Sequence, residues 1–415
     1  MLRSSNATTR ALSSAVLGAF ILAPLPALAL DGDQFGMALK ESVKRQGVLL
    51  DYASASVDGS TVILSGLELG MASLEAQGAG ENARITVPDD VRFENVQEFD
   101  GGGYKVGRVG RDQVGATFSG VGDGAEDVTY SIGSWAIEGL SIPGESQAPE
   151  LRMARAGLFY DRVFMENFEL DVDGNRFITI ENAQSVSEMN GDDVLFDATM
   201  DGFNVDLTLL EDDPDMKAWI EGTGYRQLDA NYFAQGKWNV ETGALDMPKN
   251  TMTLQNMGEL NMDIAIGGYT PAFVESMQDI SQQMSSSDPQ QAQAASMQIL
   301  GLVSQLSFGR FVMSYTDAGM TNNLLEHYAV ENGTTRNELV AQIEQTLPLV
   351  VGQLGAPELQ GQIVDSVKTF LNDPKSFTLS LAPDTAVAFP VLMGAAMSSP
   401  AELANALNAT VRANN

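Results

Sequence analysis

The sequence predicts an α+β protein, in which a large antiparallel, β-rich N-terminal region has a helical C-terminal region packed on it. Three observations predict this class. Apolar and polar residues alternate at period two through residues 30–269, as in strands with one buried face. Apolar residues recur at helical spacing through residues 270–415, which form a helix-rich region with two short strands. Clusters of Gly, Asn and Asp separate most of the alternating stretches, as hairpin turns require.

Residues 1–29 have the features of a signal peptide. Arg3 and Arg10 lie in a stretch without acidic residues, and an apolar run follows over residues 11–22. Ala27-Leu28-Ala29 then matches an A-x-A cleavage sequence, so we expect cleavage after Ala29 and a periplasmic location. The apolar run is shorter than the ~20 residues that cross a bilayer. No later segment approaches that length, so no transmembrane span is expected after cleavage.

The chain is strongly acidic. It has 55 acidic and 23 basic residues, which give a formal net charge of −32 at pH 7. This balance argues against nucleic acid as a partner, because phosphate binding needs clustered cations. It also disfavours docking on anionic lipid. Cysteine is absent, so no disulfide stabilises the fold, and the hydrophobic content of 44% is typical of a chain with a buried core.

The N-terminal region is predicted to begin with a helix over Gln34–Gln46 and to continue as strands. Within Val128–Ile142 the alternation changes phase near Gly139, which predicts a bulge or bend there. The predicted strands are Val57–Leu69, Ala83–Val87, Val91–Phe99, Tyr104–Val109, Val114–Phe118, Val128–Ile142, Leu158–Val172, Phe177–Val186, Val194–Leu210, Trp219–Arg226, Gly236–Val240, Met252–Leu254 and Leu260–Ile266.

A loose pattern recurs in these strands, in which a small or polar residue precedes an apolar, a polar and an apolar residue. It predicts one exposed and one buried face, with a bulge or bend at the first residue. The spacing between the copies is irregular, so the pattern is no strict solenoid repeat. The copies begin at Gly66, Gly139, Asn167, Gly202 and Glu259.

Helix start signals organise the C-terminal region. Pro271 follows Thr270, and Thr335 and Ser399 each precede a Glu by three residues, as in capping boxes. We expect Pro348 to kink or split its helix. The predicted helices begin near Pro271, Asp288, Asn322, Thr335, Leu359 and Ser399, the last running through Val411, and the predicted strands are Leu306–Tyr315 and Phe377–Leu381.

The sequence offers few reactive side chains. Without cysteine there is no thiol chemistry, and one histidine, His327, is too few for a usual zinc site. No G-x-S-x-G sequence accompanies His327, so we expect a structural or surface role for it. We therefore assign no catalytic residue from the sequence.

One segment has the ligand spacing of a calcium site. Asp171, Asp173 and Asn175 recur at every second residue, as at the start of an EF-hand loop, and Glu181 follows them. The glycine and the final acid are each out of place for such a loop. The alternative interpretation is a hairpin turn at Asp173-Gly174.

Two blocks of sequence resemble known proteins. The strands containing Gly66-Leu67-Glu68-Leu69 and Gly202-Phe203-Asn204-Val205 resemble those of AsmA-like β-rich bacterial envelope proteins. The block Phe377–Pro383, followed by a capped helix, is similar to the C-termini of uncharacterised alphaproteobacterial exported proteins. The resemblance implies a cell-envelope protein, and no functional residue is carried over from it.

Three functions are compatible with these observations. The leading hypothesis is a non-enzymatic periplasmic protein that binds an apolar ligand such as a lipid, or an envelope protein. The first alternative is a structural or adhesive module tuned by calcium, which is also the one cofactor the sequence suggests. The second is a carboxylate-dependent hydrolase, which needs two acids facing each other roughly 5–10 Å apart.

Overall fold

The computed structural model describes residues 30–71, 84–87, 89–99, 101–121, 126–144, 153–154, 159–284 and 289–415. The predicted signal peptide and its cleavage position at Ala29 lie outside these residues. Within them, no helix combines the length and the apolar character needed to cross a membrane.

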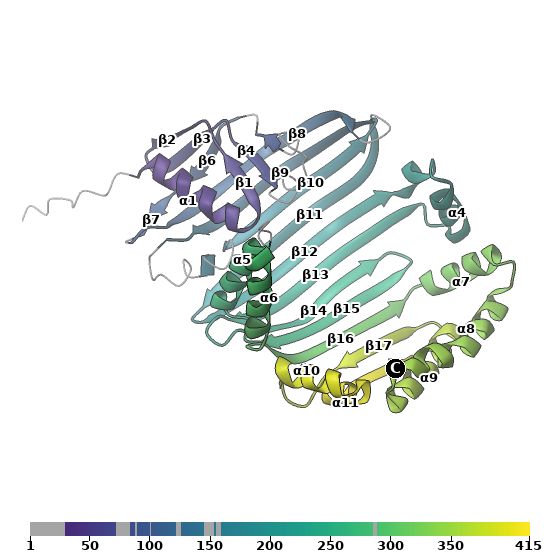
Figure 1. The fold of residues 1–415 in the computed structure, drawn as a ribbon. Coiled ribbons are helices and arrows are strands. Elements are labelled where there is room, and N and C mark those ends of the chain that lie inside the picture. Colours follow the sequence, from purple (N-terminus) through teal and green to yellow (C-terminus); the bar gives the residue numbers. More distant parts are fainter. Residues whose placement is uncertain are drawn as a thin grey trace, which may run out of the picture.

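Most of the described strands form one antiparallel sheet of 16 strands, in the order β19-β17-β16-β15-β14-β13-β12-β11-β10-β9-β8-β6-β3-β2, with β7 and β18 at its margins (Figure 1). A smaller sheet has the order β1-β4-β5. The strands are β1 Val48–Asp51, β2 Ser54–Asp58, β3 Thr61–Ser65, β4 Glu68–Met71, β5 Arg84–Thr86, β6 Val91–Glu94, β7 Gln97–Glu98, β8 Tyr104–Val121, β9 Glu126–Ile142, β10 Arg162–Val172, β11 Asn175–Asn190, β12 Asp193–Asp206, β13 Gln227–Asn239, β14 Ala244–Leu254, β15 Gly258–Gly267, β16 Ser307–Asp317, β17 Ser376–Leu381, β18 Val387–Ala388 and β19 Ala409–Ala413.

Helix α1 lies on the N-terminal strands, and the other helices lie at the ends of the long strands and along the C-terminal edge of the sheet (Figure 1). The helices are α1 Gly32–Arg45, α4 Pro214–Thr223, α5 Pro271–Met284, α6 Pro289–Val303, α7 Met320–Glu331, α8 Arg336–Val351, α9 Pro357–Asn372, α10 Phe389–Ser398 and α11 Pro400–Ala406, with 3-10 turns η2 Leu207–Leu210 and η3 Gly352–Leu354. The chain is therefore mostly antiparallel sheet with helices toward its C-terminal end, as the sequence predicts. Strands from both sides of residue 270 belong to the large sheet, because β15 pairs with β16.

The N-terminal end of the sheet has a conventional core. Helix α1 lies against β1, β2 and β3, and its Phe35 is fully buried with its ring edge-on to the rings of Phe93 and Tyr104. Val106, Leu140 and other apolar side chains complete this cluster. Burial of such side chains stabilises this part by about 1.5–3 kcal/mol each.

The recurring strand pattern marks bends in the backbone, one of the two features that it predicts. Gly66, Gly139, Asn167 and Gly202 have φ values between 53° and 66°, which place the backbone in the left-handed region. The fifth copy differs, since the positive φ of 155° belongs to Gly258, one residue before Glu259. At Gly202 the register between β12 and β13 also shifts, as at a bulge, whereas Gly66 lies between β3 and β4.

Several sequence predictions about single elements are wrong. Val57–Leu69, predicted as one strand, is divided among β2, β3 and β4. Trp219–Arg226, predicted as a strand, belongs largely to α4 because the Asp213 side chain accepts hydrogen bonds from the N–H groups of Asp215 and Met216. The last helix does not reach Val411 but ends at Ala406.

After α11, Asn408 adopts a φ of 48°, and residues 409–413 form β19, which pairs with β17. Helix α10 was not predicted at all. The predicted helix start at Thr335 is confirmed, since Thr335 and Glu338 form the reciprocal hydrogen bonds of a capping box. Pro348 lies inside α8, which continues to Val351.

We expect Gly202→Ala to lower the free energy of unfolding by about 3 kcal/mol, because an added Cβ would be strained at this φ and would also collide with a neighbour. The Cβ would lie 2.3 Å from Cγ of Glu181 on β11. Gly191 is the matched control, because its φ of 64° is nearly the same and a Cβ there meets nothing within 4 Å. Gly191→Ala should cost about 1 kcal/mol in urea unfolding. Equal losses for the two variants would contradict the steric role of Gly202.

Candidate ligand-binding face

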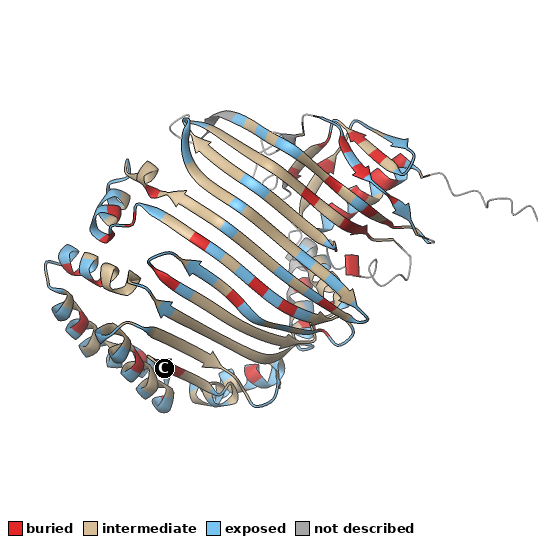
Figure 2. Cartoon of the chain, turned by 180° about the vertical axis from the view of Figure 1, so that it is seen from behind, coloured by how far each residue is buried: buried red, intermediate tan, exposed pale blue. Residues whose placement is uncertain are grey.

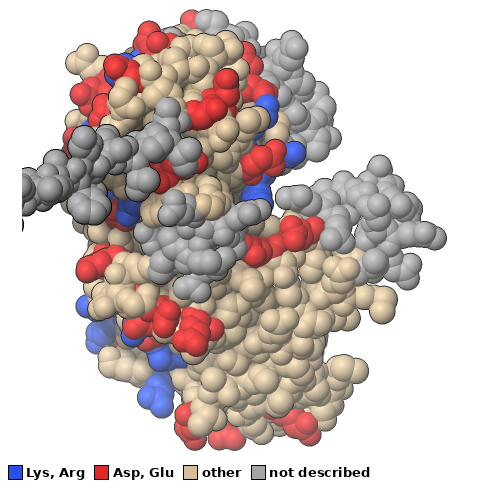
Figure 3. Space-filling view, turned by 90° about the vertical axis from the view of Figure 1, so that its left-hand side faces the viewer, with Lys and Arg blue, Asp and Glu red and all other residues tan. Residues whose placement is uncertain are grey.

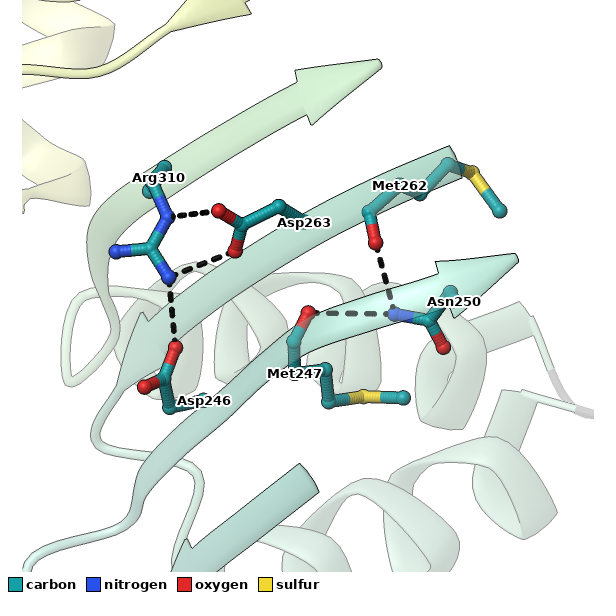
Figure 4. A network of polar contacts seen from close by, with 6 residues as sticks. All are labelled: Asp246, Met247, Asn250, Met262, Asp263 and Arg310. Carbon is teal, nitrogen blue, oxygen red and sulfur yellow. Dashed lines mark hydrogen bonds and ion pairs between the residues drawn. The ribbon is translucent and has the colours of Figure 1, made fainter. Parts of the chain in front are cut away.

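One face of the large sheet is polar, and cross-strand contacts connect its side chains. On β16, Arg310 donates two hydrogen bonds of 2.7 Å to the carboxylate of Asp263 on β15 and one of 2.8 Å to Asp246 on β14 (Figure 4). Further polar pairs on this face are Arg108–Glu138, Ser134–Glu166, Gln235–Asp197, Asn204–Asp229 and Thr251–Asn261. We call this side the polar face.

The opposite side is apolar across ten strands. Directly paired residues of neighbouring strands point to the same side of a sheet, so the printed register defines rows of side chains. One row contains Trp135, Met165, Ala183, Met200, Tyr232, Met252, Leu260, Tyr315, Phe377 and Ala413, from β9 to β19. With strands about 4.8 Å apart, the row is about 40 Å long. We call this side the apolar face.

The rows next to it have the same character. Met262, Met313 and Leu379 form one neighbouring row on β15–β17, and Ile264, Phe311 and Leu381 form the next. All six side chains are only partly buried, and Met252 is 40% exposed. None of the three buried apolar clusters found among the described residues includes a side chain of β10 or of β14–β17. The middle of the apolar face is therefore not covered by a core of its own.

Helices flank this face at the two ends of the strands. At one end the Trp238 indole donates a 2.7 Å hydrogen bond to the Tyr269 carbonyl, and the Tyr269 ring packs on Phe273 of α5. At the other end Phe370 of α9 lies edge-on to Tyr315 and Phe377. In Figure 1, which views the sheet from the side of α1 and α5, no helix crosses the middle of β12–β16, and Figure 2 shows the opposite, polar face. The result is a single-layer sheet whose apolar face is framed by helices.

The one buried amide on the apolar face has its hydrogen bonds satisfied within the sheet. The Asn250 side-chain N–H₂ group donates to the carbonyls of Met247 and Met262 at 3.3 and 3.2 Å (Figure 4). The Tyr232 hydroxyl lies 3.4 Å from the Asn250 amide oxygen. These bonds fill the bulge between Met247 and Asn250. Asn250 therefore leaves no unsatisfied polar group facing an apolar occupant.

A polar network closes one end of the face beside α7. Asp317 accepts hydrogen bonds from the N–H groups of Gly319 and Thr321 and from the Tyr315 hydroxyl, at 2.8 to 2.9 Å. Burial raises the pKa of Tyr315, and the neighbouring Asp317 carboxylate raises it further. Burial alone would raise the pKa of Asp317, but the hydrogen bonds outweigh it and lower this pKa. Tyr315 therefore stays neutral while Asp317 stays charged and caps α7.

A cavity of about 580 Å³ lies at the opposite end of the face. Met189 of β11 and Val240, which directly follows β13, line one side of the cavity. Pro271 and Ala272 line it from the start of α5. Asp192 and Glu241, both exposed, border it. The cavity extends the apolar face beyond the strand ends.

The calcium candidate residues form the hairpin turn that was the alternative interpretation. Asp173 and Gly174 have φ values of 50° and 76° between the paired residues Val172 and Asn175, as in a type I′ turn. Asp171 pairs with Arg176, and the Asp173 carboxylate accepts the Asp127 N–H at 2.8 Å.

The Asn175 amide donates to the Asp173 carbonyl at 3.4 Å. Over the described part of the chain, no three His, Cys, Asp or Glu side chains are grouped so that they could hold a metal ion. Calcium binding at Asp171, Asp173 and Asn175 stays a prediction from the sequence.

His327 lies on α7, and its side chain contacts α4. Its ring packs on Gly222 of α4, where an added Cβ would be 2.0 Å from Nδ1, and it is edge-on to Tyr328. These contacts fit the structural role expected for it. On the polar face, the facing acids Asp246 and Asp263 are bridged by Arg310, so both are committed to an ion pair.

A family model described as "Uncharacterized protein" matches residues 251–414. No curated protein matches the chain significantly. The matched segment begins near the end of β14 and includes β15–β19 and α5–α11, and thus the C-terminal part of the apolar face.

We expect Asp317→Asn to lower the free energy of unfolding by about 1–2 kcal/mol at pH 7, because the added N–H₂ group cannot accept the bonds that cap α7. A lowered folded-state pKa means that the wild type has this stabilisation above the unfolded pKa of about 3.9 and loses it as the pH falls through the lower folded value. Thermal melts should therefore show the two proteins converging below about pH 4. Asp212→Asn, in an exposed loop, is the control and should change little at any pH.

Proposed function

We propose that this protein is a non-enzymatic binding protein of the periplasm, whose apolar face holds an elongated apolar ligand such as a lipid acyl chain. The continuous apolar row across ten strands supports the proposal most directly. The two neighbouring rows on β15–β17 widen it into one connected apolar surface. A large connected apolar surface is typical of a binding site.

The chemistry of the face favours a chain without charged groups. The buried Asn250 amide makes its hydrogen bonds within the sheet, and the raised pKa of Tyr315 keeps its hydroxyl neutral. Side chains of Met200, Met252, Met262 and Met313 contribute to it, and methionine adapts to apolar partners of different shape. A long chain laid across the strands would cover them without requiring a specific polar partner.

We expect Met252→Glu to weaken binding of the uncharged apolar fluorophore N-phenyl-1-naphthylamine at least about tenfold, because a buried carboxylate without a partner is costly. Phe233→Glu is the matched control. Phe233 lies on the adjacent strand β13, is 36% exposed and points to the polar face, whereas Met252 is 40% exposed on the apolar face. Fluorescence titration of the full chain should show normal binding for Phe233→Glu.

Native mass spectrometry of the purified protein provides an independent test. We expect bound lipid in the wild type and less of it in Met252→Glu. A bare wild-type protein that also leaves the fluorophore unbound would rule out the proposed function.

A further inference from the structure

A rim of exposed apolar side chains lies along the C-terminal edge of the sheet. On α10 and at the end of α8, Met397 is 90% exposed and Leu349 is 75% exposed. Further exposed apolar residues of the rim are Met297, Leu300, Val350, Leu354, Val391 and Met393. They come from three segments, residues 289–306, 345–357 and 385–401, none of which contains a charged residue.

Direct contacts join the three segments. The Phe389 N–H at the start of α10 donates to the Leu306 carbonyl just after α6, at 3.1 Å. At the other end, Pro400 of α11 is 3.8 Å from where a Cβ on Gly355 would lie, so α11 touches the turn between α8 and α9. In Figure 1, α10, α11 and the lower ends of α8 and α9 lie along the lower margin of the molecule. The segments thus form one continuous rim beside β17 and β19, where the apolar row ends.

The charge of the molecule makes this rim unusual. The chain carries −32 in total, yet the rim segments carry none. Figure 3 shows a broad area without charged side chains in the lower half of the molecule, at the end where α6 and α10 lie. Acidic residues border each segment, so the uncharged surface is confined to the rim itself; they are Asp288, Glu344, Glu358, Asp384 and Glu402. Exposed apolar side chains in an uncharged stretch favour a lipid surface or a protein partner.

Two observations disfavour a second copy as the occupant. Two molecules with a charge of −32 repel each other. The outer edge of β19 is also engaged, because the Val411 N–H donates to Gln362 at 3.1 Å and the Val411 carbonyl accepts from Ser366 at 3.0 Å. These bonds from α9 take the place of a further strand at that residue. A zwitterionic bilayer has no net charge and places no such electrostatic cost on docking.

We propose that this rim docks the protein on a bilayer of zwitterionic lipid, next to the end of the apolar face. The inference rests on the proposed function, because a membrane would supply the acyl chain that the face holds. Met397 and Leu349 insert at the boundary between headgroups and acyl chains, and the acidic remainder of the surface keeps the protein away from anionic lipid.

Co-sedimentation of the full chain with phosphatidylcholine vesicles tests the rim. We expect the wild type to bind, and the double variant Met397→Glu/Leu349→Glu to bind at least about tenfold more weakly. Val330→Glu is the matched control, because Val330 is 79% exposed on α7, away from the rim, and this variant should bind as the wild type does. Met397→Leu should also retain binding, and phosphatidylglycerol added to the vesicles at low salt should reduce it.

The same variants separate this inference from the proposed function. The rim variant should still bind N-phenyl-1-naphthylamine, and Met252→Glu should still bind vesicles. A wild type that binds the fluorophore but ignores vesicles would overturn the rim inference and leave the proposed function standing. A wild type that is dimeric, and monomeric in the rim variant, would instead identify the rim as an interface between two copies and would equally overturn docking on lipid. Vesicle binding without fluorophore binding would support the rim and contradict the apolar face.

Discussion

The structure depends on one constraint, the alternation of side chains along hydrogen-bonded strands that stay in register across the sheet. Because paired residues point to the same side, each strand adds to the same two faces. A one-residue slip in β15 would exchange Leu260 and Met262 for Asp263 and Asn261 on the apolar face. At Gly202 the register shifts, and β12 continues to pair with β13 on both sides of that shift.

The two faces are stabilised by different interactions. The polar face is held by ion pairs and amide contacts, such as the Arg310 guanidinium between Asp246 and Asp263. These contacts are partly exposed, so each contributes about 1 kcal/mol or less. The apolar face has side chains in contact with one another but no layer over its middle. Burial of apolar side chains therefore stabilises the sheet most where helices pack on it, at the α1 core and at the strand ends near α5 and α9.

This arrangement gives a physical reason for a binding role. A protein that needs only stability would cover such a face with helices, because burial of each large apolar side chain contributes about 1.5–3 kcal/mol. Here the helices stop at the strand ends, and the partly open side chains of Met200, Phe203, Met313 and Phe311 remain accessible. An apolar ligand that covers these side chains gains binding free energy from the same burial of apolar surface. The uncharged rim lies beside the end of that opening, where the proposed bilayer would supply an apolar chain.

The sequence alone determined the antiparallel strands, the bends at Gly139 and Gly202, and most C-terminal helices, because these follow from local periodicity and capping. It also predicted the hairpin at Asp173-Gly174 as an alternative to a calcium loop. It did not reveal α4 or β19, where a local cap and a pairing partner distant in sequence decided the outcome. The apolar row and the rim were likewise decided by the tertiary structure. Each gathers residues that are far apart in the chain, such as Trp135 and Phe377, and only the register of ten strands brings them onto one face.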